Sequence, residues 1–373
     1  MSQQYTVYKS DISYFSGKLE AYMRYKEIPH RLVDCNQKTL EMIASKTGTK
    51  KMPAIEMDNG QWLYDTTPMI QWLENQHPQN PVVPKDPALA FLALLIEDYG
   101  DEWLWRPAMW WRWVPKISRV SLGRRIASEL ISSHLAIPIS FYFGRRQLNE
   151  WLWKDGVDEQ NSSEVRDMLY HELDSLEAIF TDQPFMLGSH PSMADFGYFG
   201  SMFRHFNNDP VSGEVMRRCG PKTNEWIARL WSTSSSELTP TIDWHWPSAP
   251  YWRPLLRRIA KDYLPYLHQN ALAFSQHKER FDFTGDSLQF KGTVTTHYRV
   301  WCRQELQREF SELSAEEQQR IEALFADVGG LAHLHEDGTI ESGLGPRFEL
   351  PIDPNSVKQK PSIRQRIFGQ PRN

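Results

Sequence analysis

The chain has 373 residues, which exceeds what one hydrophobic core usually holds and is typical of two domains with a further element. Its 42 Lys and Arg against 47 Asp and Glu leave a formal charge of −5, so no global positive field favours nucleic acid or an anionic membrane surface. Hydrophobic residues make up 40% and charged residues 24%, which is ordinary globular usage and excludes a wholly disordered or fibrous chain.

The cysteines and the N-terminus indicate the compartment. Cys35, Cys219 and Cys302 lie far apart without a C-x-x-C spacing, so neither a disulfide framework nor a thiolate zinc site is expected. The first residues lack the apolar run of a secretory signal, and the longest apolar run, residues 88–96, is too short to span a bilayer. We therefore expect a cytoplasmic protein that binds neither membranes nor nucleic acid.

The first 80 residues alternate strand and helix patterns. In chain order the predicted elements are a strand at 5–9, a helix at 16–26, a strand at 30–35, a helix at 38–45, strands at 53–57 and 61–64 around a turn, and a helix at 66–76. The order β-α-β-α-β-β-α predicts a mixed sheet with helices on its faces.

The remaining chain divides at a proline-rich segment and again near Ser232. Prolines at 78, 81, 84 and 87 predict an interdomain linker. Helical patterns follow at 88–113, 122–153, 163–181, 192–206 and 221–231. Beyond them, 251–279 and 299–327 look helical, and 283–299 contains short strand-like runs. The predicted domains are 1–80, 87–231, an extension at 232–353 packed on the helical domain, and a mobile basic tail at 354–373.

Five segments resemble one known family. TVYKSDISYFSGKLEAYMRYKEIPHRLV is similar to the first strand, S-x-x-S or C-x-x-C turn and first helix of the glutathione S-transferase superfamily. KKMPAI resembles its cis-proline segment, and LYDTTPMIQWLE its acidic-then-hydroxyl glutathione loop. PSMADFGYFG resembles its S-x-x-D capping box, through Ser192 and Asp195, and PKTNEWIARL a late helix. The resemblance covers residues 5–231 in the expected order.

The resemblance implies both a fold and a reaction. The fold is α/β plus all-α, with a thioredoxin-like N-terminal domain followed by a helical bundle of the superfamily's C-terminal type. The activity is that of a serine-type, bacterial-like glutathione transferase, which uses glutathione as co-substrate without a separate cofactor and acts on a small, largely apolar electrophile. A homodimer is implied as well. Alternatives are a glutathione-dependent lyase or β-etherase and a non-catalytic binding or scaffold protein.

Two serines are candidates for the catalytic hydroxyl. A cysteine thiol, with a pKa of about 8.5, supplies little thiolate at neutral pH. A hydroxyl at a helix N-terminus can stabilise the thiolate through a hydrogen bond and the helix dipole. By motif position Ser13 aligns with the family's catalytic residue, and Ser16, one turn on, is the alternative. Either serine can instead be only an N-cap.

Two further segments are expected to hold glutathione. A cis bond at Pro53 would turn the backbone of Met52 toward the cysteinyl part of the ligand, against the alternative of simple turn-breaking. Backbone N–H groups at Asp65 and Thr66 would receive the γ-glutamyl carboxylate, and the Asp65 carboxylate its ammonium group. Capping is the alternative for both, and the two roles can coexist.

The remaining candidates are weaker because each has an ordinary explanation. Lys38 and Lys51 are candidates for the glycyl carboxylate, although surface lysines are common. The acceptor pocket is expected between the domains, lined by Tyr14, Phe15, Trp105, Met109 and Trp110, although such stripes are more often core. Arg106 and Arg112 are candidates for an anionic acceptor. His333 and His335 would share one face of a strand, but a surface turn is the expected interpretation and no metal site is predicted.

Overall fold

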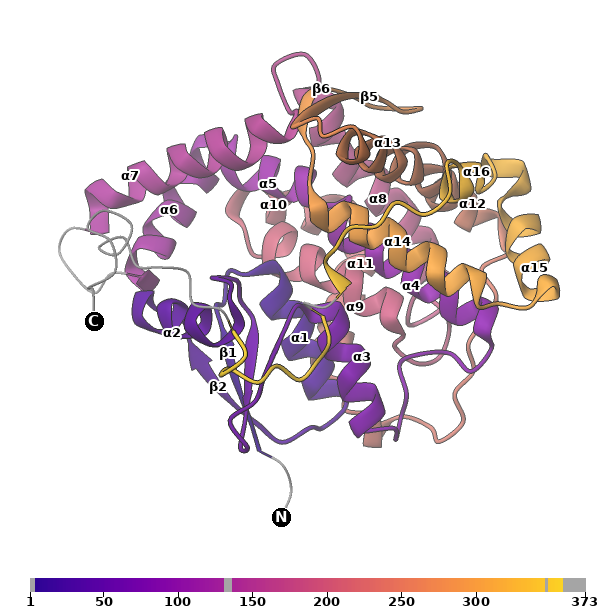
Figure 1. Ribbon diagram of the computed structural model, residues 1–373, viewed down its shortest axis with the longest axis horizontal. Helices are drawn as coiled ribbons and strands as arrows, with labels where there is room; N and C mark the ends of the chain where they lie inside the picture. The colour runs from indigo at the N-terminus through magenta and orange to yellow at the C-terminus, as the bar shows by residue number, and fades with distance from the viewer. Residues whose placement is uncertain (1–3, 131–135, 346–347, 358–373) are drawn as a thin grey trace, which may run out of the picture.

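The computed structural model describes residues 4–130, 136–345 and 348–357 (Figure 1). Most of the tail that we predicted to be mobile, residues 358–373, lies outside these described residues. In the part of the chain that is described, no helix is both long and apolar enough to cross a membrane.

The N-terminal unit is a four-stranded mixed sheet between helices. Its elements are β1 (Tyr5–Lys9), α1 (Tyr14–Tyr25), β2 (His30–Asp34), α2 (Gln37–Thr47), β3 (Ala54–Met57), β4 (Trp62–Tyr64) and α3 (Thr66–Gln76). The strand order is β2-β1-β3-β4, with β1 parallel to β2 and the other pairs antiparallel. The predicted element order and mixed sheet are confirmed.

Side chains alternate between the two faces of this sheet, as the two-residue period of a strand requires. Val7 and Ile55, paired across β1 and β3, join the core that includes α1 and α3. Their neighbours Tyr8 and Ala54 join a smaller cluster beneath α2, which contains Ile43. The sheet is thus covered on both faces.

Helices follow from residue 87 to residue 232. They are α4 (Pro87–Glu102), α5 (Trp105–Trp113), α6 (Lys116–Leu130), α7 (Ala136–Gln147), α8 (Ser162–Asp182), α9 (Met193–Phe199), α10 (Pro210–Cys219) and α11 (Pro221–Ser232). Together with the sheet, they confirm the predicted fold class of α/β plus all-α. The Ser192–Asp195 capping box is also confirmed, because an Asp195 carboxylate oxygen accepts the backbone N–H of Ser192 at 2.9 Å.

Between residues 87 and 232, two predicted helices are divided and one helix was missed. The stretch 88–113 is two helices, because Pro107 has no N–H for the carbonyl of Trp103 and its ring crowds that carbonyl. The stretch 122–153 is also divided, and α6 and α7 pack closely enough that a Cβ on Gly123 would lie 2.6 Å from the Ser140 carbonyl oxygen. We missed α10, although an N-cap Asp209 before a proline is a recognised start signal.

The extension packs on the helices rather than standing apart. Its regular elements are α12 (Arg253–Arg258), α13 (Leu264–Ser275), β5 (Arg280–Thr284), β6 (Gln289–Val294), α14 (His297–Ser311), α15 (Ala315–Phe325) and α16 (Ala332–His335). Figure 1 shows α14 lying across α4, and the rings of Phe91 and Phe310 meet there with centroids 5.3 Å apart. His333 and His335 lie on the short helix α16, a single helical turn, where we expected a surface turn rather than a strand.

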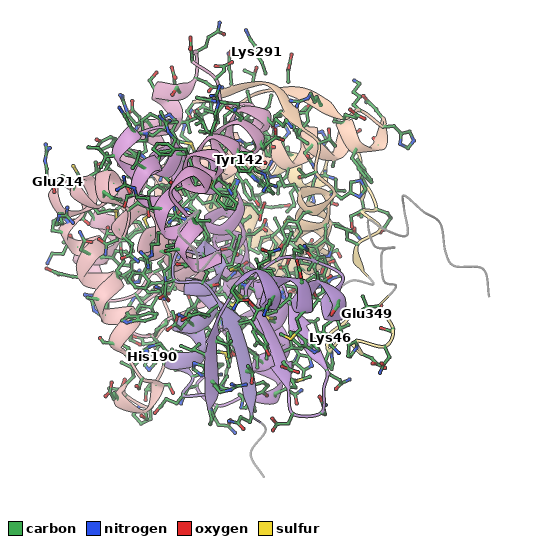
Figure 2. All side chains as sticks on the ribbon, turned by 90° about the vertical axis from the view of Figure 1, so that its left-hand side faces the viewer. Lys46, Tyr142, His190, Glu214, Lys291 and Glu349 are labelled. Atoms are coloured by element: carbon green, nitrogen blue, oxygen red, sulfur yellow. The ribbon has the colours of Figure 1, made fainter. Side chains whose placement is uncertain are left out.

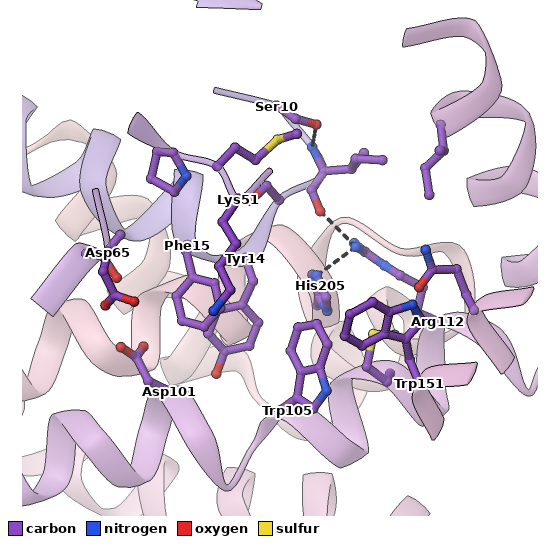
Figure 3. Close-up of a pocket in the computed structure, with 18 of the residues that line it drawn as sticks. Ser10, Tyr14, Phe15, Lys51, Asp65, Asp101, Trp105, Arg112, Trp151 and His205 are labelled. Carbon is purple, nitrogen blue, oxygen red and sulfur yellow. Dashed lines mark hydrogen bonds between the residues drawn. The ribbon is translucent and has the colours of Figure 1, made fainter. Parts of the chain in front are cut away.

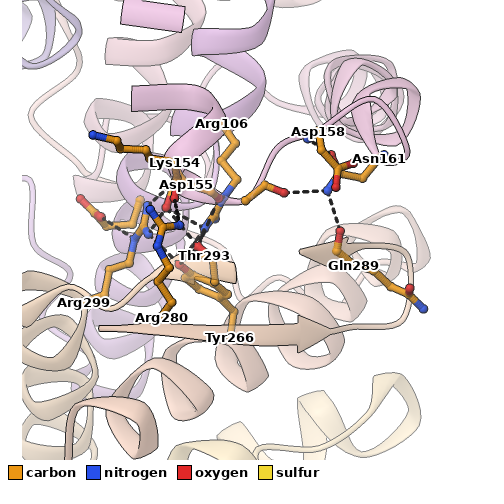
Figure 4. Close-up of polar contacts among 12 residues, drawn as sticks. Arg106, Lys154, Asp155, Asp158, Asn161, Tyr266, Arg280, Gln289, Thr293 and Arg299 are labelled. Atoms are coloured by element: carbon orange, nitrogen blue, oxygen red, sulfur yellow. Dashed lines mark hydrogen bonds and ion pairs between the residues drawn. The ribbon is translucent and has the colours of Figure 1, made fainter. Parts of the chain in front are cut away.

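A buried ion cluster ties the extension to the helices (Figure 4). Asp155, between α7 and α8, pairs with Arg106 of α5 at 3.1 Å and with Arg299 of α14 at 2.9 Å. Arg106 and Arg299 each also donate to the Tyr266 hydroxyl at 2.6 Å. Burial alone would raise the pKa of Asp155, but the two guanidinium groups lower it, so the cluster is ionised. Arg106 is therefore a structural residue and not an acceptor-binding one.

The two ends of the molecule differ in architecture. Figure 2 shows the N-terminal sheet at one end and Lys291, on the β5–β6 hairpin, at the other.

Near the sheet, Ile352 forms an antiparallel bridge with Trp62 of β4, with backbone nitrogen–oxygen distances of 2.9 and 2.7 Å. Residues close to the C-terminal end of the described chain thus cover the edge of the first sheet.

Candidate functional site

A cavity of about 530 Å³ lies where the N-terminal unit meets the helices and the extension (Figure 3). Its walls come from the start of α1, the loop before β3, the start of α3, the end of α4, α5, and the start of α14. The predicted residues that line it are Ser13, Tyr14, Phe15, Lys51, Met52, Pro53, Asp65, Thr66, Trp105 and Met109. Ser16, Lys38 and Trp110 are not among its lining residues.

Ser13 lies at the N-cap of α1 and faces the cavity. Its Oγ accepts the backbone N–H of Ser16 at 3.3 Å, so the capping role is confirmed. That bond uses a lone pair and not the hydroxyl hydrogen, which can be donated to a ligand. Ser16 is only 1% exposed, and its Oγ accepts the backbone N–H of Ser10 at 3.3 Å. The structure therefore places Ser16 inside the turn, where burial keeps it from the cavity.

Arg112 braces the turn that carries Ser13. It donates to the carbonyl oxygen of Ile12 at 2.8 Å, to both oxygens of Asp209 at 2.6 and 2.9 Å, to the carbonyl oxygen of Arg204 and to the His205 ring. These bonds use all five guanidinium N–H donors. Arg112 therefore has no donor left for an anionic acceptor, and our prediction of that role was wrong.

Two more contacts fix the same turn. The Ser10 hydroxyl donates to Glu129 of α6 at 2.7 Å, and Arg204 donates to the carbonyl oxygen of Asp11 at 3.0 Å. Sequence reasoning missed these contacts, because the partners come from distant helices. The Ser13 turn is thus held from three sides by the helical part of the chain.

The Met52–Pro53 peptide bond is cis, as predicted. It directly precedes β3, and Lys51 and Met52 face the cavity. Lys51 also places its ammonium nitrogen 5.1 Å from the ring centroid of Tyr298. Lys38 lies exposed on α2 and outside the cavity, because the helix turns its side chain to solvent.

Asp65 combines an unusual backbone with a half-buried carboxyl group. Its φ of 68° lies in the left-handed region, which costs a non-glycine residue of order 1 kcal/mol or more. It precedes α3, yet its side chain forms no capping bond and instead accepts the Tyr298 hydroxyl at 2.9 Å. Burial raises the pKa of the Asp65 carboxyl, while Lys51 and Tyr298 act in the opposite direction. Thr66, the first residue of α3, is buried beside it.

A buried lysine supports this side of the cavity. Lys18 of α1 donates to Glu97 and Asp101 of α4 and to the Thr67 hydroxyl of α3. Burial alone would lower the pKa of Lys18, but the two carboxylates raise it, so the lysine is charged. Asp101 lines the cavity, and its Oδ1 has no hydrogen-bond partner among the described residues.

The opposite wall is apolar and comes mainly from α5. Trp105, Met109 and Trp113 recur every four residues and line the cavity, as one helical face requires. Trp110 is rotated away from that face, and its indole N–H donates to Ser162 of α8 at 2.7 Å. Placing Trp110 in the acceptor pocket was therefore wrong, and the helical spacing alone could have excluded it.

No metal centre is visible in the described ranges of the chain, where no group of three His, Cys, Asp or Glu side chains is arranged to hold an ion. His333 instead contacts Glu336 at 2.8 Å on the surface.

Comparison with known proteins identifies the first part of the chain. Residues 7–81 match the family described as "Glutathione S-transferase, N-terminal domain". The N-terminal domain is that of the glutathione S-transferase superfamily. Within this transferase domain lie the serine turn, the cis-proline and the Asp65–Thr66 pair, all at the same cavity.

Solved structures with similarity include several glutathione S-transferases. One from Pseudomonas fluorescens Pf-5 is 18% identical, with 64% of this chain and 99% of that chain covered and a TM-score of 0.38. One from Methylobacterium radiotolerans, in complex with glutathione sulfonate, is 17% identical, with 64% and 96% covered and a TM-score of 0.38. The β-etherase LigF from Sphingobium sp. strain SYK-6 is 18% identical, with 63% and 97% covered and a TM-score of 0.45. At these scores the matches carry no argument about the reaction, and no curated protein matches the chain.

Proposed function

We propose that the chain is a glutathione transferase, which binds glutathione in the cavity and directs its thiolate at an electrophilic, largely apolar small molecule. The observation that supports this most is the meeting of three segments in one cavity. The Ser13 turn, the cis-proline loop and the start of α3 line it together, opposite the apolar face of α5. The cavity volume of about 530 Å³ is within the range of small-molecule sites.

Ser13 is the residue that we assign to thiolate stabilisation. Its hydroxyl would donate to the sulfur, and the N-terminus of α1 adds the positive end of a helix dipole. Both effects favour the charged form, so they lower the pKa of the bound thiol. The thiolate then forms a bond to the electrophilic carbon, and the leaving group departs with the electron pair of the bond that breaks.

The rest of glutathione follows the polar side of the cavity. The backbone of Met52 would pair with the cysteinyl part, and the free N–H groups at the start of α3, at Thr66, would receive the γ-glutamyl carboxylate. Asp65 would accept from the ammonium group, and Lys51 is the cation available for the glycyl carboxylate. The acceptor would lie against Trp105, Met109 and the other apolar side chains of α5. The homodimer and the cytoplasmic location stay predictions.

The test compares Ser13→Ala with Ser16→Ala. Thiolate absorbance followed against pH should show a higher thiol pKa for bound glutathione in Ser13→Ala, with turnover of an aryl halide lowered about 100-fold and glutathione affinity nearly unchanged. Ser16→Ala should change both quantities much less, since that side chain lies outside the cavity. A larger effect at Ser16 would overturn the assignment. Absence of turnover with aryl halides and aryl ethers, despite bound glutathione, would favour a binding protein.

A further inference from the structure

The extension supplies one wall of the cavity. Thr296, Tyr298 and Arg299, at the start of α14, line it beside residues of the N-terminal domain. Arg299 is held by Asp155 in the buried ion cluster. The start of α14 is therefore anchored and forms a fixed part of the site.

Tyr298 forms a hydrogen bond with the side chain of Asp65. Its hydroxyl donates to Oδ1 of Asp65 at 2.9 Å, across 233 residues of sequence. Burial and the Asp65 carboxylate raise the pKa of Tyr298 well above its ordinary value, so the phenol remains a donor at neutral pH. The Tyr298 ring in turn packs against Trp301 and Phe348, with centroids 5.4 and 6.1 Å away. This bond uses one acceptor position of the Asp65 carboxylate and leaves the others for a ligand.

A second carboxylate faces Asp65. Figure 3 shows the Asp101 side chain, at the end of α4, pointing toward that of Asp65. The Asp101 side chain is only 6% exposed, its Oδ2 bonds Lys18, and its Oδ1 has no hydrogen-bond partner among the described residues. Burial, Glu97 and Glu102 raise the pKa of Asp101 well above its ordinary value, and Lys18 acts in the opposite direction. A cationic group of a ligand bound at Asp65 would also approach the unpaired Oδ1 of Asp101.

We infer that the extension completes the γ-glutamyl end of the site within a single chain. Tyr298 is a positioning residue that fixes the Asp65 carboxylate so that it receives the α-ammonium group of a γ-glutamyl peptide. This inference rests on the proposed glutathione site, because that ammonium is the ligand's one cationic group.

The first experiment measures glutathione affinity by calorimetry in Tyr298→Phe. The variant keeps the ring and its contacts and removes only the hydroxyl, so the dissociation constant should rise about 3- to 10-fold. Tyr263→Phe is the matched control: the Tyr263 hydroxyl also donates to a buried aspartate, Asp98, at 2.5 Å, but Tyr263 does not line the cavity. The control should bind glutathione like the wild type.

A second ligand isolates the ammonium group. Glutathione acetylated on the γ-glutamyl nitrogen has no cation there, so the wild type should bind it about 10-fold or more weakly than glutathione. For this ligand, wild type and Tyr298→Phe should bind equally. Equal affinity of the wild type for both ligands would overturn the inference, and this comparison needs no variant, so it decides the matter even if Tyr298→Phe fails to fold.

The outcomes separate the inference from the proposed function. If the wild type does not bind glutathione at all, the proposed function fails. If the wild type binds glutathione but Tyr298→Phe binds it equally well, only the inference fails. If Tyr298→Phe weakens both ligands by the same factor, Tyr298 does not act through the ammonium subsite, and the inference fails as well.

Discussion

Replacing Lys18 by Met tests the electrostatic support beneath the cavity. The Lys18 side chain is completely buried, and Glu97 is 1% exposed. Its ammonium group joins α1 to α4 through Glu97 and Asp101 and to α3 through the Thr67 hydroxyl at 3.1 Å. Met fills nearly the volume of the lysine stem, so the substitution removes the charge with little change in packing.

The expected cost follows from burial. Removing one partner of a buried ion pair costs about 3–5 kcal/mol, because the other charge is left uncompensated. Here two carboxylates lose the same partner, so we expect the unfolding free energy to fall by at least about 3 kcal/mol. The exposed pair Lys222–Glu225, with side chains 45% and 57% exposed, is worth only about 0–1 kcal/mol. Lys222→Met is therefore the matched control.

Urea unfolding followed by circular dichroism measures both variants at pH 7. In Lys18→Met the unpaired Glu97 and Asp101 should have raised pKa values in the folded state, so folding takes up protons. The deficit should therefore shrink as the pH falls from 7 toward 5. Similar losses in Lys18→Met and Lys222→Met, both below about 1 kcal/mol, would refute the idea that the buried lysine supports the fold.

Three other perturbations have distinct expectations. Truncation after Ser232 removes the extension, which packs on α4 and α8, and should lower Tm by about 10 °C or cause aggregation. A chain that ends at Asp353 should have the Tm of the full chain. Thermal unfolding of the two truncated chains measures both effects. Gly197→Ala would place a Cβ 2.6 Å from the Cα of Glu97, where the backbone cannot easily move away. The free energy of unfolding measured in urea should therefore fall by about 2 kcal/mol or more. A decrease of less than about 0.5 kcal/mol would contradict the close crossing of α4 and α9. Burial and Arg112 lower the pKa of His205 well below its ordinary value. The unfolding free energy should therefore fall as the pH drops below about 6.5, by up to about 1.4 kcal/mol per pH unit. Urea unfolding measured at several pH values should show a smaller decrease for His205→Gln than for the wild type.

The predictions succeeded where the information was local. Two-residue and 3.6-residue periods, together with the turn residues between them, defined the elements of the first 80 residues. The division at Pro107 was missed, since the apolar pattern of 88–113 continues through the break. The missed helix α10 is short, so its pattern was interpreted as a polar turn between the neighbouring helices.

The site residues likewise include some that local sequence patterns predicted and some that they did not. Ser13, Pro53 and Asp65 could be placed because each lies in a short motif with a defined order. Tyr298 could not, because its bond to Asp65 forms only after the extension packs on α4. No local pattern in the sequence indicates a contact between residues 233 positions apart.

The bridge between Trp62 and Ile352 has a consequence for synthesis of the chain. The edge of β4 leaves the ribosome about 290 residues before the segment that pairs with it. At about 5–20 residues per second, this edge strand waits roughly 15–60 s without its partner. An unpaired edge can accept a strand from any neighbouring chain. The nascent protein is therefore most exposed to misassembly before its last residues are made, and translation speed becomes one determinant of how much of it folds correctly.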